Sequence, residues 1–91
     1  MLPSVKQLRY ICAVAEYKHF SKAAEACHVT QSTLSAAIQE LESQLGVVIF
    51  ERNKKAVLIT PLGEKLLNQA RLILGNVEDF VGLAKSHDEA L

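Results

Sequence analysis

The chain has 91 residues, with ten basic and ten acidic side chains, so its formal net charge at pH 7 is zero. This length gives room for one small domain. It contains no apolar run approaching the ~18 residues of a membrane-spanning helix, so we expect no contact with a membrane. Hydrophobic residues make up 49% of the chain but Trp is absent, and a core of aliphatic side chains favours helices over a sandwich or barrel.

The chemistry-bearing residues exclude several classes of function. Cys12 and Cys27 lie inside helical patterns and no secretory signal is recognisable, which predicts reduced thiols in a cytoplasmic protein. Cys-x-x-Cys and His-x-x-x-His spacings are both missing, so we expect neither a metal nor another cofactor. A Gly-rich phosphate loop, a nucleophile motif and a carboxylate pair are missing too, so the sequence does not predict an enzyme.

The charges are distributed unevenly along the chain. Residues 1–60 carry seven basic and five acidic side chains, whereas residues 61–91 carry three basic and five acidic ones. This mild positive excess in the first part gives only weak support to a nucleic-acid partner.

Two short helices are predicted in the first third of the chain. Ser4 and Gln7 form a capping box, and apolar residues then recur at helical spacing over residues 5–17. Ser21 is the predicted N-cap of a second helix over residues 22–28, which is rich in Ala.

A third helix is predicted after a turn of about two residues. Thr30 is its N-cap and Gly46 marks its end. Its apolar positions form a single stripe made of Leu34, Ile38, Leu41 and Leu45. We expect Cys27, Val29, Leu34 and Ile38 to face a core shared by the second and third helices.

The remaining pattern predicts a β-hairpin and one long helix. Residues 47–50 and 57–59 are apolar and mostly β-branched, with a polar, basic segment between them. Thr60 and Pro61 have the form of an N-cap and a first helical residue. A heptad-like apolar seam of more than twenty residues follows, at Leu62, Leu66, Ala70, Ile73, Val77, Phe80 and Ala84.

The segment 21–41 has the organisation of a helix-turn-helix motif, which places its second helix in the major groove of DNA. Amides and hydroxyls on the exposed face of that recognition helix can read base edges. The predicted DNA-binding residues of the recognition helix are Thr30, Gln31, Ser32, Thr33, Ser35, Ala36 and Gln39. The hairpin then acts as a wing on the flanking backbone or minor groove, through Arg52, Lys54 and Lys55.

The long helix has two interpretations. An isolated small domain offers little surface to cover so long a seam, which favours pairing with a second copy. The predicted dimer contacts are Ile73, Val77, Phe80, Leu83 and Ala84. The alternative is an amphipathic helix that lies back on its own domain.

These motifs together resemble the N-terminal domain of LysR-type transcriptional regulators, and the resemblance covers nearly the whole chain. It is carried by His19-Phe20-Ser21-Lys22-Ala23-Ala24, Val29-Thr30-Gln31-Ser32-Thr33-Leu34-Ser35, Ile38, Leu41-Glu42, Leu45-Gly46-Val47, Phe50-Glu51-Arg52 and Thr60-Pro61-Leu62-Gly63. Within the family, the segments 24–29 and 31–35 are most similar to the peroxide-sensing members.

The resemblance implies a mainly α fold, with three helices and a small β-hairpin wing over residues 1–60 and a dimerising linker helix over residues 61–91. It implies a bacterial regulator that binds double-stranded DNA at a pseudo-palindromic site as a homodimer, with a tetramer in the full-length protein. An effector would be bound by a C-terminal domain that this chain lacks.

Two departures from the family pattern bear on DNA reading. Ser32 stands where many members have Pro, and residues 31–45 contain no Lys or Arg. Guanine reading by Arg is therefore not expected from this helix. Because the net charge is zero, a winged-helix protein-interaction module with a coiled-coil dimer arm is the alternative; only DNA binding would weaken steeply with salt.

Overall fold

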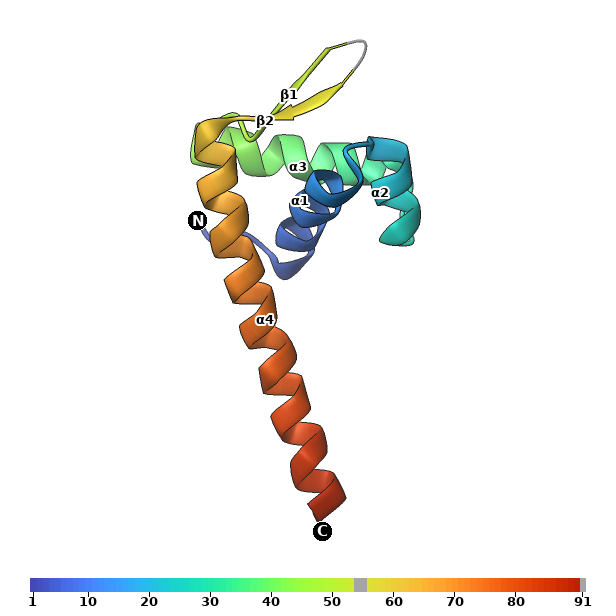
Figure 1. The fold of residues 1–91 in the computed structure, drawn as a ribbon, viewed down its shortest axis with the longest axis vertical. Helices are drawn as coiled ribbons and strands as arrows, with labels where there is room; N and C mark the ends of the chain where they lie inside the picture. Colours follow the sequence, from blue (N-terminus) through green and yellow to red (C-terminus); the bar gives the residue numbers. More distant parts are fainter. Residues whose placement is uncertain (54–55, 91) are drawn as a thin grey trace.

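The computed structural model describes residues 1–53 and 56–90, the side chains of residues 88–90 excepted. Three helices pack into a small bundle, a two-stranded antiparallel ribbon projects from it, and a long helix extends away (Figure 1). The elements are α1 (Val5–Tyr17), α2 (Phe20–Ala26), α3 (Gln31–Leu45), β1 (Phe50–Arg52), β2 (Val57–Ile59) and α4 (Pro61–Ala90). The predicted order of elements, a winged helix-turn-helix followed by a long helix, is confirmed.

Local capping fixes most of the helix ends where the sequence predicts them. The Ser4 hydroxyl accepts the Gln7 N–H at 3.1 Å, while the Gln7 side chain accepts the Ser4 N–H at 2.9 Å. The Thr30 hydroxyl accepts the Thr33 N–H at 3.2 Å, and Gly46 ends α3 in the left-handed region with φ +68°. These interactions involve residues at most a few positions apart, so the sequence alone could identify them.

The start of α2 differs from the prediction. The N-cap is His19, not Ser21, because the His19 ring Nδ1 accepts the Lys22 N–H at 3.2 Å. The helix thus begins at Phe20, whose ring is buried in the core. The imidazole nitrogen accepts the backbone N–H hydrogen bond that a Ser or Thr hydroxyl usually accepts at an N-cap.

The first strand also begins later than predicted, at Phe50 rather than Val47. The Val47 N–H donates to the Glu42 carbonyl at 3.0 Å, and the Ile49 N–H donates to the Glu42 carboxylate at 2.7 Å. These donors therefore serve the end of α3 and not a β-ladder. The ribbon that remains is short, with Phe50 opposite Ile59 and Arg52 opposite Val57.

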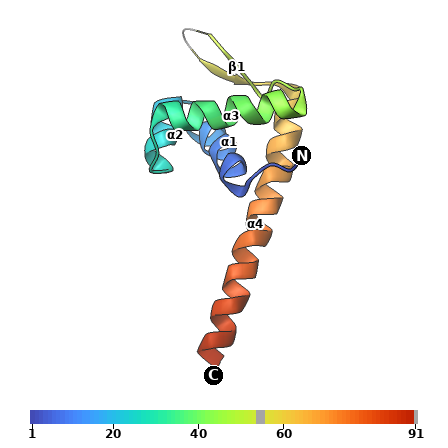
Figure 2. The same cartoon turned by 180° about the vertical axis from the view of Figure 1, so that it is seen from behind.

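The core is mainly aliphatic and lies between α1, α2, α3, the start of the ribbon and α4. Its fully buried large side chains are Ile11, Val14, Leu34, Ile38, Leu41, Ile49 and Leu67. Leu67 and its buried neighbour Ala70 come from the first half of α4, which packs against α1 (Figure 2). Beyond about residue 74, α4 leaves the domain and its side chains become exposed. Within the described residues, no helix combines the length and apolarity needed to cross a bilayer.

Candidate nucleic-acid interface

The turn between α2 and α3 brings the two helices into close contact. Ala23 and Ala24 are buried where α2 meets the core, and the Val29 N–H donates to the Ala24 carbonyl at 3.0 Å. His28 adopts φ +58° at the turn, a conformation that residues other than Gly rarely take. Leu34 and Ile38 are fully buried and Cys27 and Val29 partly so, as expected for the core face of the motif.

The face of α3 away from this core carries the predicted DNA-binding residues. Exposed side chains are Thr30, Gln31, Ser32, Thr33, Ala36 and Gln39, while Ser35 is half-buried. The Thr30 hydroxyl donates to the Thr33 hydroxyl at 2.8 Å, so both are engaged in the helix cap. Gln31 and Gln39 make no side-chain hydrogen bond to other described residues and therefore present free amides.

Beside α3 the ribbon and the start of α2 enclose a cationic cleft of about 330 Å³. The guanidinium carbon of Arg52 lies 3.9 Å from the centroid of the Phe20 ring, a cation–π contact. Phe20 in turn meets the Phe50 ring edge-on, with centroids 6.2 Å apart. The polar lining of this wing cleft is made of Lys18, His19, Ser21, Gln31, Arg52 and Asn53.

The wing cleft modifies the sequence interpretation of the wing. The sequence predicts Arg52 near the hairpin tip, but its side chain folds back over α2. Sequence reasoning missed Lys18, His19 and Ser21, although the short polar connector before α2 is a usable signal. The predicted contacts at Lys54 and Lys55 lie outside the described residues.

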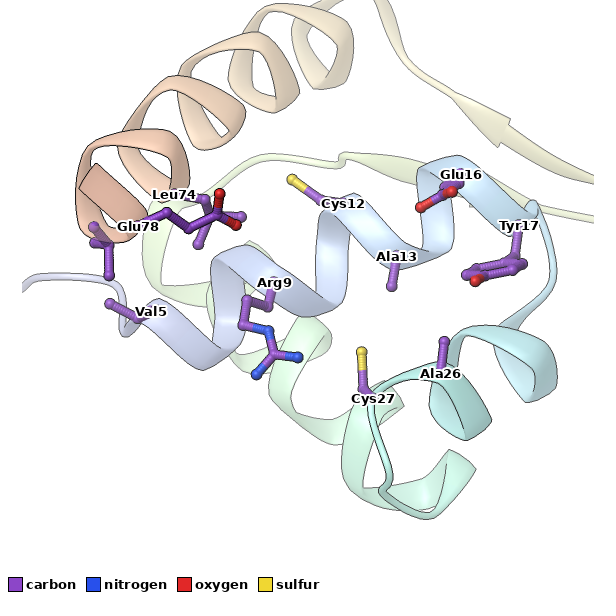
Figure 3. Close-up of a pocket in the computed structure, with 11 residues that line it drawn as sticks. Val5, Arg9, Cys12, Ala13, Glu16, Tyr17, Ala26, Cys27, Leu74 and Glu78 are labelled. Atoms are coloured by element: carbon purple, nitrogen blue, oxygen red, sulfur yellow. The ribbon is translucent and has the colours of Figure 1, made fainter. Parts of the chain in front are cut away.

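A second groove, lined by both cysteines, lies between α1, the end of α2 and the middle of α4 (Figure 3). Cys12 and Cys27 are half-buried free thiols. Burial raises the pKa of the Cys12 thiol, and the positive charge of Arg71 partly offsets that rise. Among the described residues, no group of three or more His, Cys, Asp or Glu side chains could hold a metal ion.

Most of the predicted dimer contacts lie on the part of α4 that has left the domain, while Ile73 lies just before this point and lines a pocket with Leu8 and Ile11. Ile73, Val77, Phe80, Leu83 and Ala84 are all exposed. Two members of the predicted seam behave differently, because Ala70 is buried and Leu66 half-buried against the chain's own domain. The helix therefore lies back on its own domain in its first half, while pairing of its second half with another copy stays a prediction.

Residues 5–64 match the family model of the bacterial regulatory helix-turn-helix protein, lysR family, and the chain belongs to this family. It is 44% identical over 90 residues to the HTH-type transcriptional regulator EstR of Acinetobacter baylyi, covering 99% of this chain and 30% of that protein. It is 41% identical over 88 residues to the DNA-binding transcriptional dual regulator OxyR of Escherichia coli, covering 97% of this chain and 29% of OxyR. The chain thus spans about a third of the length of these relatives.

Solved structures give the same assignment. A full-length OxyR variant from Pseudomonas aeruginosa superposes with a TM-score of 0.88 at 46% identity, covering 91% of this chain and 28% of that one. The DNA-binding domain of BenM, in a complex with benA site 1 DNA, superposes with a TM-score of 0.85 at 37% identity. The match covers 91% of this chain and 93% of the BenM chain. The predicted similarity to the peroxide-sensing members is confirmed, since relatives named OxyR or hydrogen peroxide-inducible genes activator recur.

Proposed function

We propose that this chain binds double-stranded DNA sequence-specifically, as the DNA-binding part of a LysR-type transcriptional regulator of the OxyR type. The observation that carries the proposal is the pairing of an exposed polar face on α3 with the neighbouring cationic wing cleft. The likeness to the BenM domain, whose structure is a DNA complex, supports it. Relatives named as transcriptional regulators support a non-catalytic role.

In this proposal α3 enters the major groove. Its small exposed side chains permit close approach, and the free amides of Gln31 and Gln39 can each donate to and accept from an adenine edge. Contacts from Thr30, Ser32, Thr33, Ser35 and Ala36 complete the predicted set. Because α3 carries no Arg or Lys, its readout would rest on amides, hydroxyls and methyl contacts.

The wing supplies affinity that does not depend on sequence. Arg52 and Lys18 place two positive charges in the wing cleft, the charge that a DNA phosphate requires. Lys54 and Lys55 are proposed to reach the flanking backbone or minor groove. Attraction to phosphates would therefore be concentrated beside α3, which compensates for a recognition helix that has no basic side chain.

Residues 1–60 would form the DNA-binding unit and residues 61–91 the linker that pairs two copies. Ile73, Val77, Phe80, Leu83 and Ala84 are the proposed contacts of a homodimer, whose two-fold axis would match a pseudo-palindromic site. In the complete regulator we propose a tetramer, with an effector bound by a further C-terminal domain. Because the bacterial chromosome is cytoplasmic, the proposal places the protein in the cytoplasm.

The experiment selects a duplex from a random-sequence pool and measures its affinity at several salt concentrations. Replacing Gln31, Thr33 or Ser35 with Ala should reduce binding to the selected duplex by about 1–3 kcal/mol per lost base contact and spare random DNA. The matched control is Gln44→Ala, an exposed amide near the other end of α3. Equal weakening on both duplexes would contradict the assigned role.

The wing is tested separately by Arg52→Ala and Lys55→Ala. Each should weaken all sequences similarly and lower the salt slope by about one per lost phosphate contact. The second candidate function, a winged-helix protein-interaction module, is favoured only by the zero net charge. A chain that binds no duplex at low salt would support that candidate.

A further inference from the structure

The segment 48–50, which joins α3 to the wing, is held by side chains on both of its sides. On one side, the Glu42 carboxylate oxygen Oε2 accepts the Ile49 N–H at 2.7 Å and the Phe50 N–H at 3.2 Å. Glu42 is half-buried on the last turn of α3. Hydrogen bonds to a charged acceptor are stronger than neutral ones, so this double contact is a firm attachment.

On the other side, Thr60 connects the same segment to α4. Its hydroxyl donates to the Val48 carbonyl at 2.6 Å, and its N–H donates to the Ile49 carbonyl at 3.0 Å. Thr60 thus links the segment before β1 to the start of α4. Among the described residues, Glu42 is the one side chain of α3 that forms hydrogen bonds with the segment 48–50 or the ribbon.

The attachment at Phe50 extends to the wing cleft. Alternate residues of a strand point to the same side, so Phe50 and Arg52 share a face of β1. On that face the Phe50 ring packs edge-on against Phe20, and the Arg52 guanidinium lies over the same Phe20 ring. A continuous series of contacts therefore joins the carboxylate of Glu42, through Phe50 and Phe20, to the cationic group of Arg52.

We propose that Glu42 is a positioning residue for the DNA contact of the wing. It acts through the backbone of Ile49 and Phe50 and not by touching DNA. This inference rests on the proposed function and deepens it. In this proposal, the last turn of α3 positions Arg52 of β1, which makes the phosphate contact.

The test is a double-mutant cycle between Glu42→Gln and Arg52→Ala, measured on the selected duplex over a range of salt concentrations. The amide of Gln keeps the size of the side chain but offers a weaker, uncharged acceptor to the two N–H groups. We expect Glu42→Gln to lower the salt slope by about one, as Arg52→Ala does. In the Glu42→Gln background, Arg52→Ala should then cost far less than in wild type, a coupling of roughly tenfold.

The matched control is Glu40→Gln, which removes the same charge from an exposed site on α3 that bonds only Gln44 among the described residues. In the Glu40→Gln background, Arg52→Ala should reduce the affinity for the selected duplex as much as it does in wild type. Glu42→Asp keeps the charge with a shorter reach, and should be intermediate in salt slope. Amide hydrogen exchange of Ile49 and Phe50 without DNA should accelerate in Glu42→Gln while the α1 amides stay protected.

The inference would be overturned if the losses of binding free energy from Glu42→Gln and Arg52→Ala simply added. This outcome counts when the circular dichroism of Glu42→Gln is that of wild type. If Glu42→Gln fails to fold, the Glu42→Asp cycle decides by the same criterion. Wild-type protein that binds no duplex would instead refute the proposed function, which is a separate outcome.

Discussion

The two halves of α4 both carry apolar side chains at helical spacing, but these side chains lie in opposite environments. In the inner half, Leu67 is 0% exposed and packs into the domain core. In the outer half, Phe80 is 77% and Leu83 74% exposed, on a helix that has left the domain (Figure 1). Periodicity therefore indicates that a face will be buried, but the fold decides which surface buries it.

The difference has an energetic consequence. Burial of the inner half contributes to folding of each chain, whatever its concentration. The outer half would leave an apolar strip in water, larger than monomers usually tolerate. We therefore expect the outer half to gain its stability from a second copy, which makes its contribution concentration-dependent.

The largest expected effect comes from replacing one Leu in each half with Ala. Leu67→Ala should lower the free energy of unfolding by about 2–5 kcal/mol, because it leaves a cavity in the core. Leu83→Ala removes the same atoms from an exposed site and should have little effect at low protein concentration. Urea unfolding of both variants at two protein concentrations measures this. Equal losses of unfolding free energy in the two variants at low protein concentration would contradict the difference between the halves.

A smaller effect is expected at the glycines of α4. A Cβ at Gly63 would lie 2.5 Å from the Ile49 carbonyl oxygen and 2.9 Å from Thr60 Oγ1, whereas a Cβ at Gly82 would meet nothing within 4 Å. Gly63→Ala should therefore destabilise by roughly 1–3 kcal/mol through backbone displacement. Gly82→Ala should raise helicity and stabilise by up to about 1 kcal/mol. Thermal unfolding followed by circular dichroism distinguishes the two signs.

The smallest effect concerns Cys12, which lies where α4 begins to leave α1 (Figure 3). Because burial raises the pKa of this thiol, less thiolate is present near neutral pH and alkylation should be slow. In a Cys27→Ser background, the rate of Cys12 alkylation should rise with pH. At a fixed pH, it should be faster in the urea-unfolded chain than in the native one. Leu67→Ala, which loosens the inner half, should accelerate the reaction, and Leu83→Ala should not.

The sequence predicted those features that depend on near neighbours in the chain. The caps at Ser4, Thr30 and Gly46 are local hydrogen bonds or local conformations, and all three are confirmed. The predicted start of β1 was wrong because it depends on Glu42, a side chain seven to eight positions away. Nothing in the apolar run of residues 47–50 indicates that contact.

The candidate site follows the same rule. The exposed face of α3 could be read from its single apolar stripe, since helical geometry alone places Ala36 and Gln39 away from Leu34 and Ile38. The wing cleft could not, because it depends on Arg52 folding over Phe20, which lies more than thirty residues earlier. Tertiary contacts between distant residues assemble this part of the site.

Sedimentation equilibrium of wild type and Phe80→Asp, alone and with a duplex carrying two half-sites, tests the central claim most directly. The account predicts a wild-type dimer at micromolar concentration, and two chains bound cooperatively per duplex. Phe80→Asp places a charge in the exposed apolar strip, so it should be a folded monomer that binds the half-sites independently. A monomeric wild type, or a variant as dimeric as wild type, would contradict the assignment of α4 as the helix that pairs two DNA-binding units.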